Sequence, residues 1–379
     1  MNDHFQSLPA ISLSTTTTTT ITKTNNINNN NINAKIILQI TDLHHFDPEL
    51  KIFTGPRTTV AIGNDVENLK SQALGDYSTE RGLALVRRLV TMVQPDLVVF
   101  SGDIIDGRTC QNHIIAMRQV IEPCIENQIP WTFCPGNHDD DLPSKWSRLD
   151  LLQLYDLPCC ASRGATSFNH SFRLGNDGPR IFLFDSHGST KTSKNGITMK
   201  TIESYIDWSS TQEARRERDV DNVIGLAYFH IPLYEYAKKS AKVMCGHLDP
   251  MPSMRKLYKI KDDSIRLVGL PNSNTGLYDA MLNIGNIRST FVGHDHYHDA
   301  ILSRNDNGPW LCWGRVTSFT PPSDFEEAGG PLPFPRGGRV VKVENTHVET
   351  YVVNAEGIEE ESRFELYDKS SVGSSNSKL

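Results

Sequence analysis

The chain has 379 residues, of which 38% are hydrophobic, so it can bury a large core as one domain or as two or three smaller ones. Its 38 basic and 45 acidic residues give a net charge of -7, which argues against sequence-independent attraction to nucleic acid or to an anionic membrane. No stretch approaches about 18 consecutive apolar residues, and no secretory signal is evident. The seven cysteines are irregularly spaced and are interpreted as reduced thiols, so we expect a cytoplasmic location and no membrane partner.

Low-complexity segments occur at both ends of the chain. Residues 1–34 contain a threonine run and an asparagine run, which are too polar and repetitive to specify packing. Residues 368–379 are rich in serine. We therefore predict two disordered tails that flank a single folded domain over residues 35–367.

The first half of this domain alternates apolar runs with amphipathic segments. Short runs rich in isoleucine, valine and aromatic residues predict buried strands at residues 35–41, 96–102 and 129–136. Helical spacing of apolar residues predicts helices at residues 78–94 and 112–127. This alternation favours right-handed crossovers and a mostly parallel sheet, in which ligands bind at the carboxyl ends of the strands.

The second half of the chain predicts a second sheet. Strands are expected at residues 167–173, 180–185, 223–229 and 290–293, with a helix near residues 201–218 and a hairpin that turns at Asn345-Thr346 within residues 339–354. The segment 246–275 has no regular pattern. It is either an insertion that lies over the cleft and selects the substrate, or a surface elaboration.

Side chains of the kinds that ligate metals follow five of the apolar runs. They lie in the motifs TDLHH, GDIID, GNHD and GHDH and after the run GLAYF, and they are Asp42, His44, Asp103, Asp106, Asn137, His138, His230, His294 and His296. Taken singly, each motif is also compatible with a turn or with a core histidine. Together, carboxylates and imidazoles suit Mn, Fe or Zn, and a carboxylate between two ions can bridge them.

The ordered motifs D-x-H, G-D-x-x-D, G-N-H-D, a histidine shortly before proline, and G-H-x-H resemble those of the calcineurin-like metallophosphoesterase superfamily over residues 35–354. The later spacing and the WGR at residues 313–315 are most similar to the intracellular proteins grouped by name with purple acid phosphatases. This resemblance implies an α/β fold, a four-layer αββα sandwich of two mixed sheets flanked by helices, with a dinuclear metal site at the strand ends.

The resemblance also implies a role for each motif residue. The first divalent ion would be held by Asp42, His44 and His296, the second by Asn137, His230 and His294, with Asp103 bridging the two. Asn137 and His138 would contact the substrate. His138 would assist the departing oxygen, and Asp106 would orient its ring.

The chain departs from purple acid phosphatases proper at two positions. Those enzymes have a tyrosine where this chain has Asp106 and a glycine where it has His44, so no violet colour is expected. Some relatives in this name group are labelled inactive, but every metal ligand of the general pattern is present here. We therefore expect activity.

Other polar residues near the motifs match no ligand position. The histidines of this group are interpreted as surface or loop side chains, and they are His45, His187, His247 and His298. The aspartates of the GNHDDD run, Asp139, Asp140 and Asp141, are expected to cap the following helix, or in the case of Asp139 to support the site.

The expected reaction is metal-dependent hydrolysis of a phosphoester, in which a hydroxide held between two ions about 3.5 Å apart attacks in line. The leading interpretation is a phosphomonoesterase that acts on a phosphorylated small molecule or a phosphoprotein. A phosphodiesterase for cyclic nucleotides or lipid headgroups stays open, as does a non-catalytic, metal-stabilised binding protein, although the unligated His138 argues against the latter. No nucleic acid partner is expected.

Overall fold

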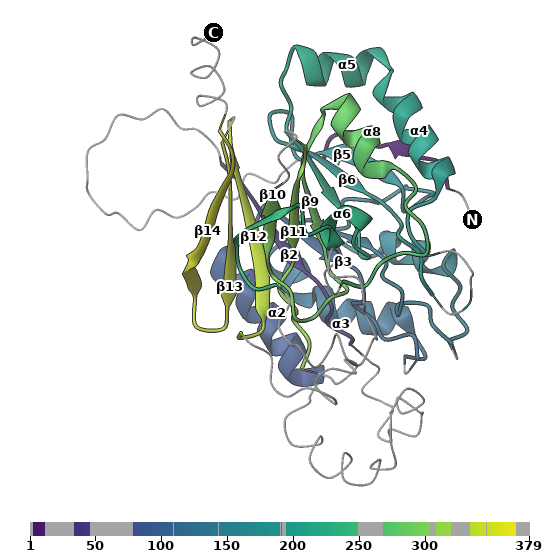
Figure 1. Cartoon of the computed structure of the whole chain (residues 1–379). Coiled ribbons are helices and arrows are strands. Elements are labelled where there is room, and N and C mark those ends of the chain that lie inside the picture. The colour runs from purple at the N-terminus through teal and green to yellow at the C-terminus, as the bar shows by residue number, and fades with distance from the viewer. Residues whose placement is uncertain are drawn as a thin grey trace.

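The computed structural model of the chain describes residues 3–11, 34–45, 79–108, 110–142, 144–189, 191, 195–248, 268–303, 308–319, 334–345 and 347–368. Two sheets form its centre (Figure 1). One has eight strands in the order β1-β5-β6-β7-β9-β11-β10-β8, and the other has six in the order β14-β13-β12-β2-β3-β4. Both sheets contain parallel and antiparallel pairs, as the sequence predicted.

The six-stranded sheet combines the strands of the first half of the chain with those of its C-terminal part. Its strands are β2 (Lys35–Ile40), β3 (Leu97–Ser101), β4 (Trp131–Cys134), β12 (Gly337–Glu344), β13 (His347–Asn354) and β14 (Ile358–Asp368). β2, β3 and β4 are parallel neighbours, and the predicted hairpin is β12 paired with β13. β14 was not predicted, because its run of glutamates on an edge strand gives little apolar signal.

The eight-stranded sheet contains the remaining strands. They are β1 (Gln6–Ser7), β5 (His170–Arg173), β6 (Arg180–Leu183), β7 (Gly225–Tyr228), β8 (Lys242–Cys245), β9 (Ile287–Val292), β10 (Ile301–Ser303) and β11 (Trp310–Trp313). β6, β7 and β9 are parallel neighbours, so their carboxyl ends lie at one edge. Of the segment 246–275, residues 249–267 lie outside the described part of the chain.

Helices cover the outer faces of both sheets. α2 (Thr79–Val93) and α3 (His113–Glu126) lie beside the six-stranded sheet, and α2 contacts β2, β12 and β13. α4 (Met199–Ser209), α5 (Gln212–Asp219) and α8 (Leu277–Ile284) lie together on the opposite side of the molecule in Figure 1. Two short helices, α6 (Tyr234–Ala237) and η1 (Asp150–Asp156), complete the described helices. No helix in the described ranges is long and apolar enough to cross a membrane.

The predicted helix near residues 201–218 is two helices. The first ends at Ser209, with Ser210 as its C-cap, and Thr211 caps the second, because its side chain accepts a hydrogen bond from the backbone N–H of Ala214. A threonine in this position favours a helix start over a continuous helix. α3 starts in the same manner, at Asn112, whose side chain accepts from two backbone N–H groups of the first turn.

A single buried layer joins the two sheets. It contains side chains from both, among them Ile37 and Val99 from the six-stranded sheet and Leu226 and Phe291 from the eight-stranded sheet. A second core lies between the eight-stranded sheet and the helices α4 and α8. The layers therefore follow the order helix, sheet, sheet, helix, which confirms the predicted four-layer αββα sandwich.

The predicted N-terminal tail is wrong for residues 3–11. β1 pairs in parallel with β5, and Phe5 lies among Phe182, Phe184, Tyr205 and Trp208 with ring centroids 5.5 to 6.0 Å away. The apolar residues ahead of the threonine run thus have an aromatic cluster to pack against. Residues 12–33 and 369–379 lie outside the described part, so the other limits of the domain stay a prediction.

Candidate metal centre

Two groups of metal-ligating side chains lie at the carboxyl ends of the central strands. One group is Asp42, His44 and His296, and the other is Asp103, His230 and His294. Within each group, the candidate ligand atoms all lie within 4.8 Å of one another. Their strands are β2, β3, β7 and β9, so both sheets contribute to the centre. The structure thus brings together six of the seven predicted metal ligands.

The two groups adjoin at Asp103. Its Oδ2 lies 3.1 Å from Nε2 of His230 in its own group and 3.8 Å from Nε2 of His44 in the other. In the first group, Nε2 of His296 lies 3.2 Å from Nε2 of His44 and 3.3 Å from Oδ1 of Asp42. A carboxylate in this place can contact ions on both sides, which is the geometry that a bridging ligand requires.

Asn137, the seventh predicted ligand, lies beside Asp103. The backbone N–H of the next residue, His138, donates to Oδ1 of Asp103 over 2.8 Å. The side-chain oxygen of Asn137 is buried and accepts no hydrogen bond from any described residue. A buried polar oxygen without a partner is costly, and a cation would satisfy it. Two carboxylates, four imidazoles and this amide oxygen fit a pair of Mn, Fe or Zn ions.

The backbone at the centre is strained. Left-handed φ angles between 50° and 74° occur at four of the candidate ligands, Asp42, His44, Asp103 and His294. Residues with a Cβ occupy this region at a cost of about 1–3 kcal/mol each, and such residues cluster at functional sites. These four residues lie two to four positions after the last residue of β2, β3 or β9.

Two motif glycines permit the close approach of neighbouring strand ends. A Cβ on Gly136 would lie 2.2 Å from Oδ1 of Asp103, and one on Gly293 would lie 2.0 Å from Oγ1 of Thr41 and 2.6 Å from Oδ2 of Asp42. No real Cβ contact is that short. The glycines of GNHD and GHDH are therefore required by packing against the ligand carboxylates.

The electrostatics of the centre favour ionised carboxylates and neutral imidazoles at His44 and His294, whereas His230 favours its protonated form. Burial holds the pKa of His44 well below its ordinary value, and burial together with His230 lowers the pKa of His294. Burial opposes the ionised form of Asp103, but the neighbouring His230 and His138 bring its pKa well below the usual range. Asp103 in turn raises the pKa of His230 to about 9 against the effect of burial. Neutral imidazole and carboxylate are the forms that bind metal ions.

Asp139 supports the centre through the backbone. Its carboxylate accepts the backbone N–H groups of Asp103, Ile104, Ile105 and Gly136 over 2.6 to 3.0 Å. It thereby holds the loop after β3 and the loop after β4 together. The expected capping role is wrong for all three aspartates of the GNHDDD run, because the next helix, η1, begins only at Asp150 and has no side-chain cap. The alternative for Asp139, support of the site, agrees with these contacts.

His138 lies next to both groups and belongs to neither. Its Nδ1 lies 2.6 Å from Oδ2 of Asp141, and its side chain is 26% exposed. Burial alone would lower the pKa of His138, but the charge of Asp103 and the hydrogen bond to Asp141 raise it. The orienting role predicted for Asp106 is therefore corrected, because Asp141 is the carboxylate on this ring. Asp106 accepts hydrogen bonds from Arg108 at Nε and Nη2 over 2.9 and 3.1 Å.

Arg108 and Asp141 are site residues that sequence reasoning missed. Arg108 is 25% exposed and pairs with Asp106, and it lies close enough to Asp103 and Asp141 that, against the effect of burial, these carboxylates and Asp106 raise its pKa. Its only sequence signal is that it is the one cation in the run GDIIDGR. The signal for Asp141 is its spacing of three residues from His138, which a sequence alone cannot distinguish from that of a capping aspartate.

The four further histidines near the motifs, His45, His187, His247 and His298, belong to neither group. All four lie outside the helices and named strands, which agrees with the loop alternative; His45, His187 and His298 are buried, and only His247, whose side chain is 53% exposed, also lies at the surface. His45 contacts Thr79 at the start of α2 and the side chain of Gln119 in α3. It therefore joins two helices to the loop that carries Asp42 and His44.

The end of the segment 246–275 lies against the metal centre. A Cβ on Gly269 would lie 2.4 Å from Nε2 of His294, and the backbone N–H of Gly269 donates to Asp295 over 2.8 Å. The described end of this segment therefore contacts a candidate ligand. Its role in substrate selection stays a prediction.

Comparisons with known proteins agree with this geometry. Residues 36–298 match the family model described as Calcineurin-like phosphoesterase. The chain is 27% identical over 252 residues to Phosphatase DCR2 of Saccharomyces cerevisiae, a match that covers 60% of this chain and spans only 41% of that protein. It is 26% identical over 307 residues to Probable inactive purple acid phosphatase 28 of Arabidopsis thaliana, covering 73% of this chain and 69% of that protein.

The fold is also similar to that of a solved structure. A dimetal phosphatase from Danio rerio superimposes with a TM-score of 0.54 and 12% sequence identity, covering 88% of this chain and 98% of that chain. At this identity the likeness concerns the fold alone.

Proposed function

This chain belongs to the calcineurin-like phosphoesterase family, and from that premise we propose that this metallophosphoesterase is a phosphomonoesterase that works with two divalent ions, Mn, Fe or Zn. One observation carries the proposal. Two adjoining ligand groups meet at Asp103, and a partly exposed histidine backed by a carboxylate lies beside them without belonging to either. A purely structural metal site has no use for such a histidine.

The chain's own residues would have distinct tasks in hydrolysis. When bound, a pair of divalent ions lowers the pKa of a bound water and polarises phosphoryl oxygens. Asp103 lies where it can hold both ions, and the side-chain oxygen of Asn137, which is buried and accepts no hydrogen bond from the described residues, would be a further ligand. Asp141 occupies Nδ1 of His138, which leaves Nε2 to give a proton to the departing oxygen. The guanidinium of Arg108 supplies positive charge for a phosphate oxygen.

The substrate that we propose is a phosphorylated small molecule or a phosphoprotein. A cytoplasmic location and the absence of nucleic acid and membrane partners are further predictions. The names of three relatives contain the word inactive, whereas this chain has every residue that the proposed reaction needs. This complete set of residues supports an active enzyme.

The test is hydrolysis by the purified chain loaded with Mn²⁺. We expect p-nitrophenyl phosphate to be cleaved with a higher kcat/KM than bis(p-nitrophenyl) phosphate. Asp103→Asn should abolish turnover and reduce the content of both metals, since one change weakens both sites. The matched control is Asp96→Asn, whose carboxylate accepts the backbone N–H of Ile36 over 2.8 Å just before β3 and lies in neither ligand group. It should retain metals and activity.

Each alternative predicts a different result. A preference for the bis ester would indicate a phosphodiesterase. Two bound ions without turnover of either ester would indicate a metal-stabilised binding protein. Equal activity of the wild type and Asp103→Asn would contradict the proposed dinuclear mechanism itself.

A further inference from the structure

A buried arginine lies beneath the loop that carries Asn137 and His138. The side chain of Arg148 is 2% exposed and precedes η1. Its guanidinium donates to the backbone oxygens of Pro135 and Gly136, and to Oδ1 of Asp140 over 2.8 Å. One side chain therefore contacts this loop both before and after Asn137.

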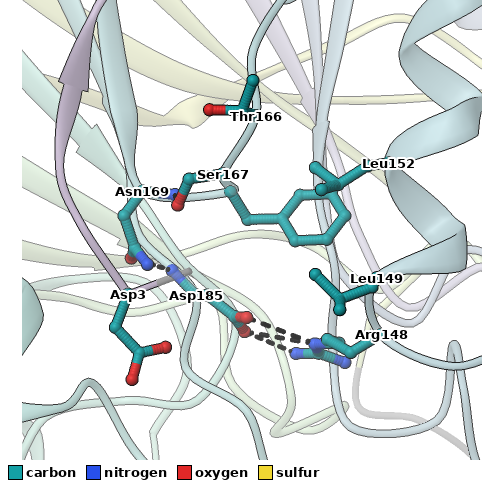
Figure 2. Close-up of a pocket in the computed structure, with 9 residues that line it drawn as sticks. Asp3, Arg148, Leu149, Leu152, Thr166, Ser167, Asn169 and Asp185 are labelled. Atoms are coloured by element: carbon teal, nitrogen blue, oxygen red, sulfur yellow. Dashed lines mark hydrogen bonds and ion pairs between the residues drawn. The ribbon is translucent and has the colours of Figure 1, made fainter. Parts of the chain in front are cut away.

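The other side of the guanidinium contacts the eight-stranded sheet. Nη2 of Arg148 donates to Oδ1 of Asp185 over 2.7 Å, just beyond the end of β6, and Figure 2 shows the two side chains facing each other. Asp185 is itself fixed, because its N–H donates to Oδ1 of Asn169 and its Oδ1 accepts the N–H of His187, both over 2.9 Å. Arg148 thus joins the loop after β4 to the loop after β6.

The joined loops touch at Asn137. A Cβ on Gly188 would lie 3.0 Å from Cβ of Asn137, so the chain after Asp185 packs directly against that side chain. The ligands that share Asn137's predicted ion, His230 and His294, belong to the eight-stranded sheet. Asn137 comes from the six-stranded sheet, so its distance from them depends on how the two loops are held.

The chemistry of the contact requires arginine. The planar guanidinium carries five N–H donors and can bind two carboxylates and backbone oxygens at once, which a lysine ammonium cannot do in the same geometry. Buried ion pairs contribute little net stability compared with apolar packing. We therefore expect the fully buried pairs of Arg148 with Asp140 and Asp185 to fix the relative position of the two loops more than to increase the free energy of unfolding.

We propose that Arg148 is a positioning residue that holds Asn137 in register with His230 and His294. This inference rests on the proposed metal centre. Residues that orient metal ligands from behind typically change metal affinity by about 10–100-fold when they are replaced. The affinity for one ion of the pair should depend on Arg148, and the affinity for the other should not.

The test is calorimetric titration of Mn²⁺ into metal-free wild type and Arg148→Lys, with kcat and Tm measured in parallel. We expect one of the two dissociation constants to rise by about 10–100-fold and the other to stay unchanged. kcat should fall at limiting Mn²⁺ and recover as Mn²⁺ is raised. A merely destabilised protein would not regain kcat in this way.

The matched control is Arg180→Lys. The side chain of Arg180 is 4% exposed and binds both carboxylate oxygens of Glu217, but it lies at the opposite end of β6 from Asp185. We expect Arg180→Lys to lower Tm to a similar degree and to bind both ions with wild-type affinity.

Three results would overturn the proposal. The first is wild-type affinity at both sites in Arg148→Lys. The second is a loss of affinity in both lysine variants in proportion to their loss of Tm. If Arg148→Lys does not fold, Asp185→Asn, which removes the charge that Arg148 binds in the loop after β6, replaces it, and unchanged Mn²⁺ affinity in that variant is the third. A wild type that binds two ions but hydrolyses no ester would contradict the proposed function alone, because the titrations still decide the role of Arg148.

Discussion

His138 and Asp141 form a hydrogen-bonded pair within one loop, with Nδ1 of His138 2.6 Å from Oδ2 of Asp141. The pair lies next to the candidate metal ligands and is partly open to solvent through His138. Asp106, which the motif pattern favoured for this role, binds Arg108 instead. Replacing Asp141 and replacing Asp106 are therefore expected to have different effects on catalysis.

Replacing Asp141 should weaken proton donation by His138. We expect Asp141→Asn to lower kcat by about 100-fold for an alkyl phosphate, because general acid catalysis is typically worth about 10²–10⁴-fold. The loss should be smaller for p-nitrophenyl phosphate, whose leaving group needs less protonation. Steady-state kinetics with both esters measure the difference. Asp106→Asn serves as the comparison, and a stronger leaving-group dependence in that variant than in Asp141→Asn would contradict the assignment.

Replacing Arg108 should weaken substrate binding. Its guanidinium lies close to Asp103 and is partly exposed, so it can donate to a phosphate oxygen. Loss of a charge-assisted hydrogen bond corresponds to about 1.5–3 kcal/mol, or about 10–100-fold in kcat/KM for p-nitrophenyl phosphate after Arg108→Ala. Arg108→Lys, which keeps the charge, should lose less. Unchanged kcat/KM in Arg108→Ala would show that Arg108 does not bind the substrate.

Acid should destabilise the protein through His170. Nδ1 of this buried ring lies 2.9 Å from the backbone oxygen of Ser167, Nε2 lies 2.7 Å from the hydroxyl of Ser162, and burial lowers the pKa from 6.5 to about 4. Between pH 6.5 and about 4 the unfolded state binds a proton that the folded state does not. The free energy of unfolding therefore falls as the pH falls through this window, by up to about 3 kcal/mol from this group.

The measurement is urea unfolding of wild type and His170→Gln at a series of pH values. The free energy of unfolding of the variant should decrease less steeply than that of the wild type between pH 6.5 and 4. Because the comparison concerns the slope, a constant loss of stability in the variant does not affect it. Parallel curves for the two proteins would show that another group causes the acid sensitivity.

The N-terminal strand should contribute to stability. Phe5 packs in a cluster of four aromatic rings from β6, its following loop and α4. Phe5→Ala should lower the free energy of unfolding by about 1–3 kcal/mol, since it removes most of a packed aromatic side chain. His4→Ala, at the exposed neighbouring position, should cost less than about 0.5 kcal/mol. Equal effects in urea unfolding would mean that the cluster does not hold this segment.

The sequence predicted the strands and the ligands for the same reason. Each central strand is a short apolar run, and the polar residue that follows it stands where parallel strands end together, so Asp42, Asp103 and His230 could be identified as candidate ligands from the residues, and the family resemblance implied which ion each would hold. Which carboxylate contacts His138 depends on how a loop folds back on itself. Three aspartates in a row give no local signal for that choice.

Tertiary packing explains the other differences. Arg148 becomes part of the site only because two loops from different sheets meet at its guanidinium. β1 forms by pairing with β5, which lies more than 150 positions later in the chain. Periodicity and turn chemistry describe neighbours in sequence, and these contacts join residues that are distant in sequence.

The division of the ligands between the two sheets has a consequence for biosynthesis. His44 and His296 lie 3.2 Å apart in space and 252 positions apart in the chain. A nascent polypeptide that has left the ribosome only as far as β7 carries four of the seven candidate ligands and none of the GHDH run. The complete metal site can therefore assemble only after most of the chain has been translated. Products truncated before this point lack ligands and should be inactive.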